Sequence, residues 1–496
     1  MNSALFIIFA FLLLSIYLGI RSTKGKKMSM EQWAVGGRGF GSLFVFLLMA
    51  GEIYTTFTFL GASSWAYGKG GPAMYVIMYM SLAYVLGYFV LPMIWKYAKE
   101  KNLVSSSDFY ESKYKSSFMG VLVAIVGVIS TIPYFVLQLK GLGIIVSEAS
   151  YGTISSGAAI WIGAIAVTVY VMISGIHGSA WTAVIKDFLI LGIVVFIGLY
   201  IPYHYYGGLG EMFKAVDAAK PGFLAIPEKG LSMSWLISTV LMTVFGFHMW
   251  PHAFGGVASA RSAKALRKNT IISPIYSLVL LFVFFVGYTA IGQVQGLKGP
   301  AADLALLKIA TMTFDPWFVG LIGAAGLLAA LVPGSMLLMA ASTLIAKNVY
   351  KTVVPTATDK QVMSLAKYLV PVFALISIYF TFNGGSTIVT LLLMAYSFVT
   401  QLAPALYFSL MKNNFVNKYG AGAGMIVGVV IVAYVTATNI TMPQIFPSLP
   451  QWIQDLNIGV IALLLNIIVT VIVSLVTGKS AATSQGNNET ATLQNN

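Results

Sequence analysis

The residues best suited to chemistry lie in one apolar run near position 50. Glu52 stands there between Gly51 and three threonines, Thr55, Thr56 and Thr58. An ionisable side chain in such a run is costly and is expected to face a cavity or a charged partner. Glycine permits local unwinding, which frees backbone carbonyls that can bind a cation. We therefore favour a cation, proton or solute site here. The structural alternative is that the threonines bond their own helix and Glu52 forms a structural pair.

A second group lies near position 250, where His248, Trp250, Pro251 and His252 follow a long apolar segment. Pro251 removes a backbone donor and should kink its helix. Histidines four residues apart would share one face of a regular helix, a spacing that suits a metal pair. No third ligand and no H-E-x-x-H pattern accompanies them, so we expect no metal. A solute contact and a buried packing histidine are equally open for His248.

Two further polar features lie inside apolar segments. Gln138 must face either a cavity or a neighbouring helix. The pair Pro333-Gly334 predicts broken backbone at membrane depth, which protein or cavity water must satisfy. Its alternative is a simple packing kink.

Two charged pairs can be explained by structural roles, without a binding site. Lys186 and Asp187 follow a predicted turn, so we expect their long side chains to reach the membrane interface. Asp108 and Glu111 are expected to form a solvated helix cap or a gate pair.

The composition requires lipid as the solvent for most of the chain. Of 496 residues, 58% are hydrophobic and 9% are charged, whereas a soluble domain carries about 25% charged residues. There is no cysteine, which excludes disulfides and thiolate metal sites, and only four histidines are present. No Walker loop or catalytic triad order is present, so we expect neither an enzyme nor an ATP-driven pump. We expect no cofactor beyond a coupling ion.

Thirteen segments are long and apolar enough to cross a bilayer, for which about 20 residues are needed. The segments are 3–20, 41–67, 74–95, 117–145, 155–174, 182–204, 234–256, 271–292, 317–346, 365–382, 386–411, 421–438 and 457–477.

The net charge of +14 is explained by membrane orientation rather than by nucleic acid. Most lysines and arginines lie in alternate linkers, which are expected to be cytoplasmic. The linkers expected outside hold only six basic residues: Lys69, Lys214, Lys220, Lys229, Lys298 and Lys308. This predicts a multi-pass cell-membrane protein with its N-terminus outside and its C-terminus in the cytoplasm. The polar tail 478–496 is expected to be disordered, and nothing indicates a fused soluble domain or an obligate protein partner.

Glycine and proline interrupt the second and the seventh spans, which lie five spans apart, and predict unwound chain near residues 51–55 and 248–256. Paired broken helices at matching places are typical of inverted-repeat transporters with a site at the membrane midplane. The fold class predicted is therefore an all-α polytopic transporter.

Several short motifs resemble those of the sodium:solute symporter family. They are Gly36-Gly37-Arg38, Phe57-Thr58-Phe59-Leu60-Gly61, Ser105-Ser106-Ser107-Asp108-Phe109 and Trp181-Thr182. The runs 51–56 and 248–252 look closest to a monocarboxylate-like branch. The resemblance implies a transporter domain over 1–477 with a five-plus-five core. Its first repeat would cover about 41–204 and its second about 234–411, with accessory helices at 3–20, 421–438 and 457–477.

The resemblance also implies two sites. A solute would bind between the second and seventh spans, with help from the fourth. The candidates are Thr55, Thr58, Gln138, His248 and Trp250. A sodium ion would bind between the second and ninth spans. Its carbonyl ligands would be Gly51, Tyr54 and Ala329, with Glu52 beside them.

The sequence departs from the family at the sodium site. The two hydroxyl ligands of the ninth span correspond to Val332 and Pro333, which cannot coordinate through a side chain. The family aspartate after Trp-Thr is Ala183, and the following glutamine is Lys186. Glu52 offers an alternative, because a carboxyl in a low-dielectric cavity holds its proton more tightly.

We therefore expect a secondary symporter that imports a small organic solute with Na⁺ or H⁺. A monocarboxylate is the favoured solute, with an amino acid such as proline as the alternative. An uncoupled facilitator of the same fold is the alternative mechanism.

Overall fold

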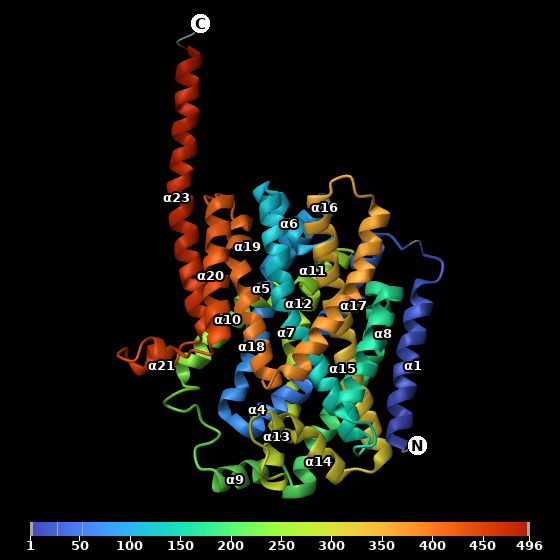
Figure 1. Ribbon diagram of the computed structural model, residues 1–496. Coiled ribbons are helices and arrows are strands. Elements are labelled where there is room, and N and C mark those ends of the chain that lie inside the picture. The colour runs from blue at the N-terminus through green and yellow to red at the C-terminus, as the bar shows by residue number, and fades with distance from the viewer. Residues whose placement is uncertain (1–2, 27, 52, 494–496) are drawn as a thin grey trace.

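The chain forms a bundle of roughly parallel helices in a computed structural model (Figure 1). The structure describes residues 3–26, 28–51 and 53–493, without the side chains of residue 50 and of residues beyond 478. Within these ranges there is no strand, and one isolated bridge joins Phe40 to Ala260. α1 begins at one face of the bundle and α23 leaves from the opposite face (Figure 1). Because the two ends lie at opposite faces, the chain crosses the bundle an odd number of times.

The first half of the chain contains nine α-helices and three short η segments. They are α1 (Ser3–Thr23), α2 (Met30–Val35), η1 (Gly36–Arg38), α3 (Ser42–Ala50), η2 (Phe57–Gly61), α4 (Ala62–Lys69), η3 (Gly71–Met74), α5 (Tyr75–Glu100), α6 (Ser106–Tyr114), α7 (Ser117–Ala149), α8 (Ser156–Tyr206) and α9 (Leu209–Ala219).

The second half continues the bundle. It contains α10 (Met233–Phe247), α11 (Pro251–Ser259), α12 (Ala263–Ser277), α13 (Leu280–Gln293), η4 (Gly299–Leu304), α14 (Ala305–Thr313), α15 (Pro316–Thr343), η5 (Leu344–Tyr350), α16 (Lys351–Val353), α17 (Asp359–Asn383), α18 (Ile388–Val399), η6 (Thr400–Leu402), α19 (Ala403–Leu410), α20 (Lys418–Thr438), α21 (Met442–Ile445), α22 (Gln451–Gln454) and α23 (Ile458–Leu493).

Ten helices of the described chain are long and apolar enough to cross a membrane, or eleven if the bent pair α10–α11 is one span. All thirteen predicted segments contain helix, but the number thirteen stays a prediction. One reason for the lower count is α8, which contains two predicted spans. Its 51 residues would extend about 75 Å as a straight helix, far beyond a hydrocarbon core of about 30 Å. Gly175 interrupts it with φ 51° and ψ −144°.

The predicted breaks in the second and seventh spans are present. α3 ends at Ala50, residues 51 and 53–55 are not helical, and the π-helix η2 follows. α10 and α11 meet at a 50° bend over residues 248–250. The prediction of unwound chain through 256 is wrong, because Pro251 begins α11. Proline is tolerated at a first helical position, where its missing N–H would have no partner.

The predicted break at Pro333-Gly334 is also wrong. α15 runs without interruption through both residues, and the alternative of a packing kink stays a prediction. α15 is central: 94% of its most apolar window is buried. Gly326 lies against Ile145 and Phe59, and a side chain there would clash with both. Small residues permit such close helix approach in membranes.

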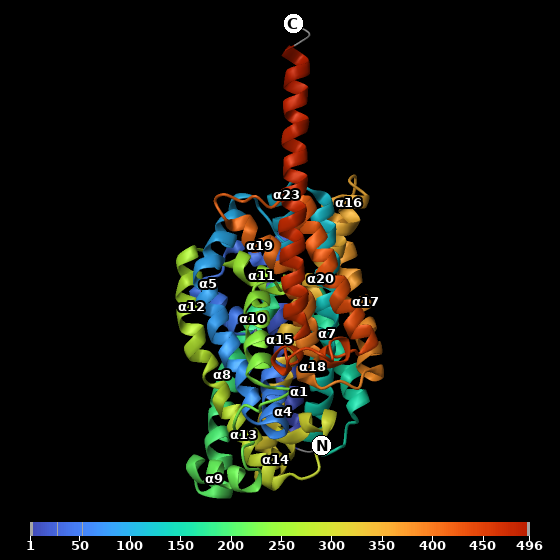
Figure 2. The ribbon, with the colours of Figure 1, turned by 90° about the vertical axis from the view of Figure 1, so that its left-hand side faces the viewer.

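The tail does not join the bundle. Residues 479–493 form the end of α23 and project away from the other helices (Figures 1 and 2). The expected disorder of residues 478–496 in solution stays a prediction.

Candidate functional site

The break after α3 is held by its own threonines. The Thr55 amide donates to Thr58 Oγ1 at 2.9 Å, and that hydroxyl donates to the Thr55 carbonyl at 3.1 Å. The Phe57 amide donates to Thr55 Oγ1 at 3.2 Å. Two of the predicted solute ligands, Thr55 and Thr58, are therefore adjacent, but their hydroxyls serve the local backbone. These bonds satisfy groups that the missing helix turns leave free.

Gln138 of α7 reaches the same break through Thr56. The Thr56 hydroxyl donates to Gln138 Oε1 at 2.7 Å, and the Thr56 amide donates to the same oxygen at 3.4 Å. Both contacts require an acceptor, so the amide oxygen faces Thr56 and Nε2 points elsewhere. Gln138 is 1% exposed, and its Nε2 has no hydrogen-bond partner among the described residues. A buried amide donor without a partner is costly, so this position favours a bound acceptor.

Trp250 lies in an aromatic cluster at the α10–α11 break. Its ring is 4.8 Å from that of Tyr134 on α7 and 5.2 Å from that of Tyr396 on α18. His252 packs against Trp250 and Tyr134 at 5.7 and 5.5 Å. The cluster connects the second break to α7, the helix that carries Gln138.

His248 belongs to a different group. Its Nε2 lies 2.8 Å from the Ala83 carbonyl of α5, which favours the packing interpretation. Because the helix breaks between His248 and His252, the two no longer share a regular helical face. Among the described residues no group of three or more potential metal ligands occurs.

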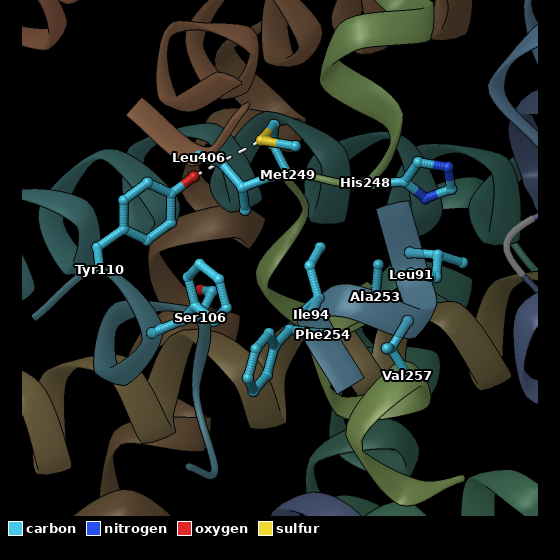
Figure 3. A pocket seen from close by; sticks show the side chains of 11 residues that line it. Leu91, Ile94, Ser106, Tyr110, His248, Met249, Ala253, Phe254, Val257 and Leu406 are labelled. Carbon is cyan, nitrogen blue, oxygen red and sulfur yellow. Dashed lines mark hydrogen bonds between the residues drawn. The ribbon is translucent and has the colours of Figure 1, made fainter. Parts of the chain in front are cut away.

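A small cavity lies beside His248, between α5, α6 and α11 (Figure 3). Its volume is about 20 Å³, enough for about one water molecule. The single Tyr110 hydroxyl proton lies between two acceptors at the edge of the cavity, the Leu402 carbonyl at 3.0 Å and Met249 Sδ at 3.6 Å, and the carbonyl is the stronger acceptor. Ser106, Ala253 and Phe254 line the same space.

The predicted cation position holds a lysine. Lys186 of α8 places Nζ 3.3 Å from the Tyr54 carbonyl and 2.9 Å from Asp187 Oδ1. A side chain on Gly51 would lie 3.4 Å from the same nitrogen. Ala329, the third predicted carbonyl ligand, is fully buried within α15. Glu52, the predicted proton carrier, lies outside the described residues.

The interfacial placement of Lys186 and Asp187 is wrong. Lys186 is 0% exposed and Asp187 is 4% exposed. Because the Gly175 break redirects α8, the pair lies opposite the unwound segment instead of at a membrane surface. A buried lysine of this kind needs both a counter-charge and hydrogen-bond acceptors.

Asp108 is a cap but is not solvated. Its carboxylate and Ser105 form a capping box at the start of α6. The carboxylate also accepts from Asn348 Nδ2 at 2.7 Å and pairs with Lys347. Burial alone would raise the pKa of Asp108, but Lys347, Asn348 and the Val104 amide outweigh it and lower the pKa.

A basic cavity opens at the opposite face, where the charge rule predicts the outside. Its volume is about 500 Å³, and Lys69, Lys220 and Lys298 line it together with Trp65 and Tyr67. These lysines are among the few in the linkers predicted to be external. Field lines from three like charges in one concave space raise the local concentration of anions.

Sequence reasoning missed three residues of this site: Thr56, Lys186 and Asp187. Thr56 was visible in the same threonine run, but its direction toward α7 was not. Lys186 stands where the family has glutamine, and that substitution was the available signal.

The chain matches known transporters over most of its length. The model of the sodium:solute symporter family matches residues 33–428. An uncharacterized symporter, YhjB, of Bacillus subtilis (strain 168) is 63% identical over 487 residues, 98% of this chain and 100% of that protein. A monocarboxylate transport permease protein of Rhizobium johnstonii is 28% identical over 438 residues, 86% of this chain and 87% of that protein.

The fold also matches a solved structure. A Na⁺-coupled sialic acid symporter in a substrate-bound outward-open state superposes with a TM-score of 0.78 at 17% identity. The match covers 96% of this chain and 98% of that one. It confirms the predicted fold class of an all-helical transporter.

Proposed function

Because the chain belongs to the sodium:solute symporter family, we propose that it imports a monocarboxylate by symport with a cation. Family membership confirms the resemblance expected from the motifs, and it makes the chain a multi-pass membrane protein of a family of solute symporters. It also supports sodium as the cation. Val332 and Pro333, which replace the expected hydroxyl ligands, are the observation against sodium.

The observation that carries the proposal is the free amide donor of Gln138. It is buried beside the break after α3, and none of the described residues accepts from it. A carboxylate oxygen is the strongest acceptor that a small solute can offer to such a donor. Trp250 and Tyr134 would then cover the apolar part of the solute.

Two further observations support an anionic solute. The basic cavity lined by Lys69, Lys220 and Lys298 lies at the face predicted to be external, where it would concentrate anions before entry. One of the relatives transports monocarboxylates according to its name. The solute is thus proposed as a small monocarboxylate with a short apolar body.

Uptake by the full chain in proteoliposomes tests this proposal. Labelled pyruvate, lactate, propionate and proline would be offered with an imposed sodium or proton gradient. We expect gradient-dependent accumulation of one or more of the carboxylates above protein-free liposomes. Equilibration without accumulation would indicate a facilitator instead, and transport of proline alone would overturn the carboxylate.

The variant Gln138→Leu tests whether the buried amide donor of Gln138 binds the solute. A hydrogen bond to a charged group contributes about 1.5–3 kcal/mol, so the apparent KM should rise about tenfold or more. Expression should change little. Gln293→Leu is the matched control, because Gln293 on α13 is only partly buried and contacts Tyr206 at 3.4 Å. An unchanged KM for Gln138→Leu would remove Gln138 from the solute site.

A further inference from the structure

The ammonium group of Lys186 lies at the position where a sodium ion would be expected. It donates to the Tyr54 carbonyl of the unwound segment at 3.3 Å, and a Cβ added at Gly51 would lie 3.4 Å from it. These are two of the three residues from which carbonyl ligands were expected. An ammonium and a sodium ion both carry one positive charge and both bind carbonyl oxygens. The tethered cation thus satisfies a carbonyl that the break in the second span leaves free.

The α15 side of this junction lacks the two hydroxyl ligands that the family resemblance implies, because Val332 and Pro333 stand in their place. Leu47 of α3, Ala183 of α8 and Val332 of α15 form one buried apolar cluster at this junction. The nearest serine of α15, Ser335, donates to the Val332 carbonyl at 2.6 Å and shares a hydrogen bond with Ser179 at 2.7 Å. Both hydroxyls are therefore used within the helix pair. Sodium prefers several oxygen ligands, and this side of the junction offers hydrocarbon.

Charged and polar groups from several elements lie around Lys186. Asp187 on the same helix supplies the counter-charge at 2.9 Å. Tyr54 of the unwound segment packs edge to face against Tyr276 of α12, with ring centroids 4.9 Å apart, and its hydroxyl donates to the Tyr276 carbonyl at 3.2 Å. Tyr84 of α5 donates to the Met49 carbonyl at 3.3 Å. On α15 the facing residue is the apolar Val332, and Glu52 lies outside the described residues.

We propose that the Lys186 ammonium takes the place of the coupling sodium ion, and that a proton carried by the Lys186–Asp187 pair drives solute import. This inference rests on the proposed function and names its coupling ion.

The cycle follows from the contacts of Lys186. With a proton taken up from the outside, Lys186 is positive, bonds the Tyr54 carbonyl and holds the break against α8. When the site opens to the cytoplasm, the N–H bond breaks and the proton leaves to water. The neutral amine keeps its electron pair and no longer makes a charge-assisted hydrogen bond to Tyr54. The segment 53–56 is then released, and the solute leaves with the proton. One solute and one proton cross together.

Coupling can be measured on the full chain in proteoliposomes. With acid outside and no sodium, a gradient of one pH unit should support up to about tenfold accumulation of a carboxylate carried with one proton. Passive entry is subtracted with protein-free liposomes. A pH-sensitive dye inside should report solute-dependent proton influx. A sodium gradient at equal pH should give no accumulation, and radioactive sodium should not enter with the solute. Sodium-driven uptake with sodium influx would overturn the inference while leaving the proposed function intact.

The variant Lys186→Arg separates charge from proton release. Arginine keeps the positive charge but does not deprotonate in proteins. We expect it to retain solute exchange between preloaded and external pools and to lose accumulation driven by the pH gradient. Lys308→Arg is the control, since Lys308 forms an ion pair with Glu148 at 2.7 Å on a partly exposed surface. It should accumulate solute like the parent protein.

The outcomes separate the two claims. Wild-type-like accumulation by Lys186→Arg would overturn the role of Lys186. If this variant does not fold, the dye and sodium measurements on the unmodified protein still decide the coupling ion. If no carboxylate is exchanged or accumulated in either gradient, the proposed function fails.

Discussion

Replacing Asp108 by asparagine should weaken the closure of the face predicted to be cytoplasmic. The Asp108 carboxylate binds Lys347 and Asn348, which belong to η5 at the end of α15. It also accepts from the Val104 amide at 2.9 Å. One carboxylate thus joins α6 to the helix that forms the centre of the bundle. Asparagine keeps the shape of the side chain and removes its charge.

The magnitude follows from the burial of the pair. A hydrogen bond to a charged group contributes about 1.5–3 kcal/mol. The Lys347 side chain is 27% exposed, so solvent screens part of the attraction. We therefore expect a loss of about 1–2 kcal/mol, which changes an equilibrium about five- to thirtyfold. The shift favours conformations in which α6 and η5 separate.

Because the sequence contains no cysteine, the labelling rate of a single introduced thiol can be measured without background. Ala253→Cys places a thiol in the small cavity beside His248, and Thr356→Cys places one on an exposed loop. Adding Asp108→Asn should raise the labelling rate at position 253 about five- to thirtyfold and leave that at 356 unchanged. An unchanged rate at 253 would refute the reasoning that this carboxylate holds the face closed.

The same carboxylate makes closure depend on pH. The pKa of Asp108 is lowered in the folded protein, because Lys347, Asn348 and the Val104 amide outweigh the effect of burial. A carboxyl with a lowered pKa contributes stability that is complete above its unfolded pKa of about 3.9. That stability is lost as the pH falls through the folded pKa. The Tm values of the parent and Asp108→Asn should therefore differ near pH 7 and converge well below pH 4.

Two further substitutions test the local geometry. Thr56→Val removes the 2.7 Å hydroxyl donor to Gln138 Oε1 and leaves only the longer 3.4 Å contact from the Thr56 amide. The loss of one buried hydrogen bond, about 1–1.5 kcal/mol, should raise the apparent KM about five- to tenfold in uptake assays. Thr56→Ser keeps the hydroxyl and should not raise it, so equal effects of the two substitutions would contradict the hydrogen bond. Gly175→Ala adds a Cβ 2.4 Å from the Trp33 ring at a φ of +51° and should strongly lower the Tm and the expression level. Gly192→Ala is the control in the same helix, because its Cβ meets nothing within 4 Å, and it should be neutral. A stable Gly175→Ala protein would show that the kink is dispensable.

The breaks in the helices could be predicted because glycine and proline act locally. Pro251 cannot continue the preceding helix, whatever packs around it. Gly51 marks the end of α3, although its own φ of −57° is an ordinary helical value. Pro333 misled the same reasoning. In a central helix such as α15, tertiary packing surrounds the residue on all sides, so the helix continues through a proline that would end an isolated one.

The side-chain partners could not be predicted, because they depend on how distant helices rotate. Gln138 and Thr56 are 82 positions apart, and their hydrogen bond requires α7 to present one face to the break. Lys186 was expected at the membrane interface because charged side chains such as lysine and aspartate have a low free-energy cost there. The kink at Gly175 directs Lys186 toward the interior. The sequence shows that a glycine is present at 175, but it does not show the φ of 51° that separates a buried Lys186 from an interfacial one.

The positions of Lys186 and Gln138 along one short segment suggest how ion and solute are coupled. Lys186 bonds the carbonyl of Tyr54, and Gln138 bonds the amide and hydroxyl of Thr56. Only one residue separates them, so the two contacts lie within about 7 Å along the backbone. A change of charge at Lys186 therefore acts on the same peptide units that orient the Gln138 amide. No long pathway between sites is needed, because the unwound segment is itself the shared element that both ligands bias.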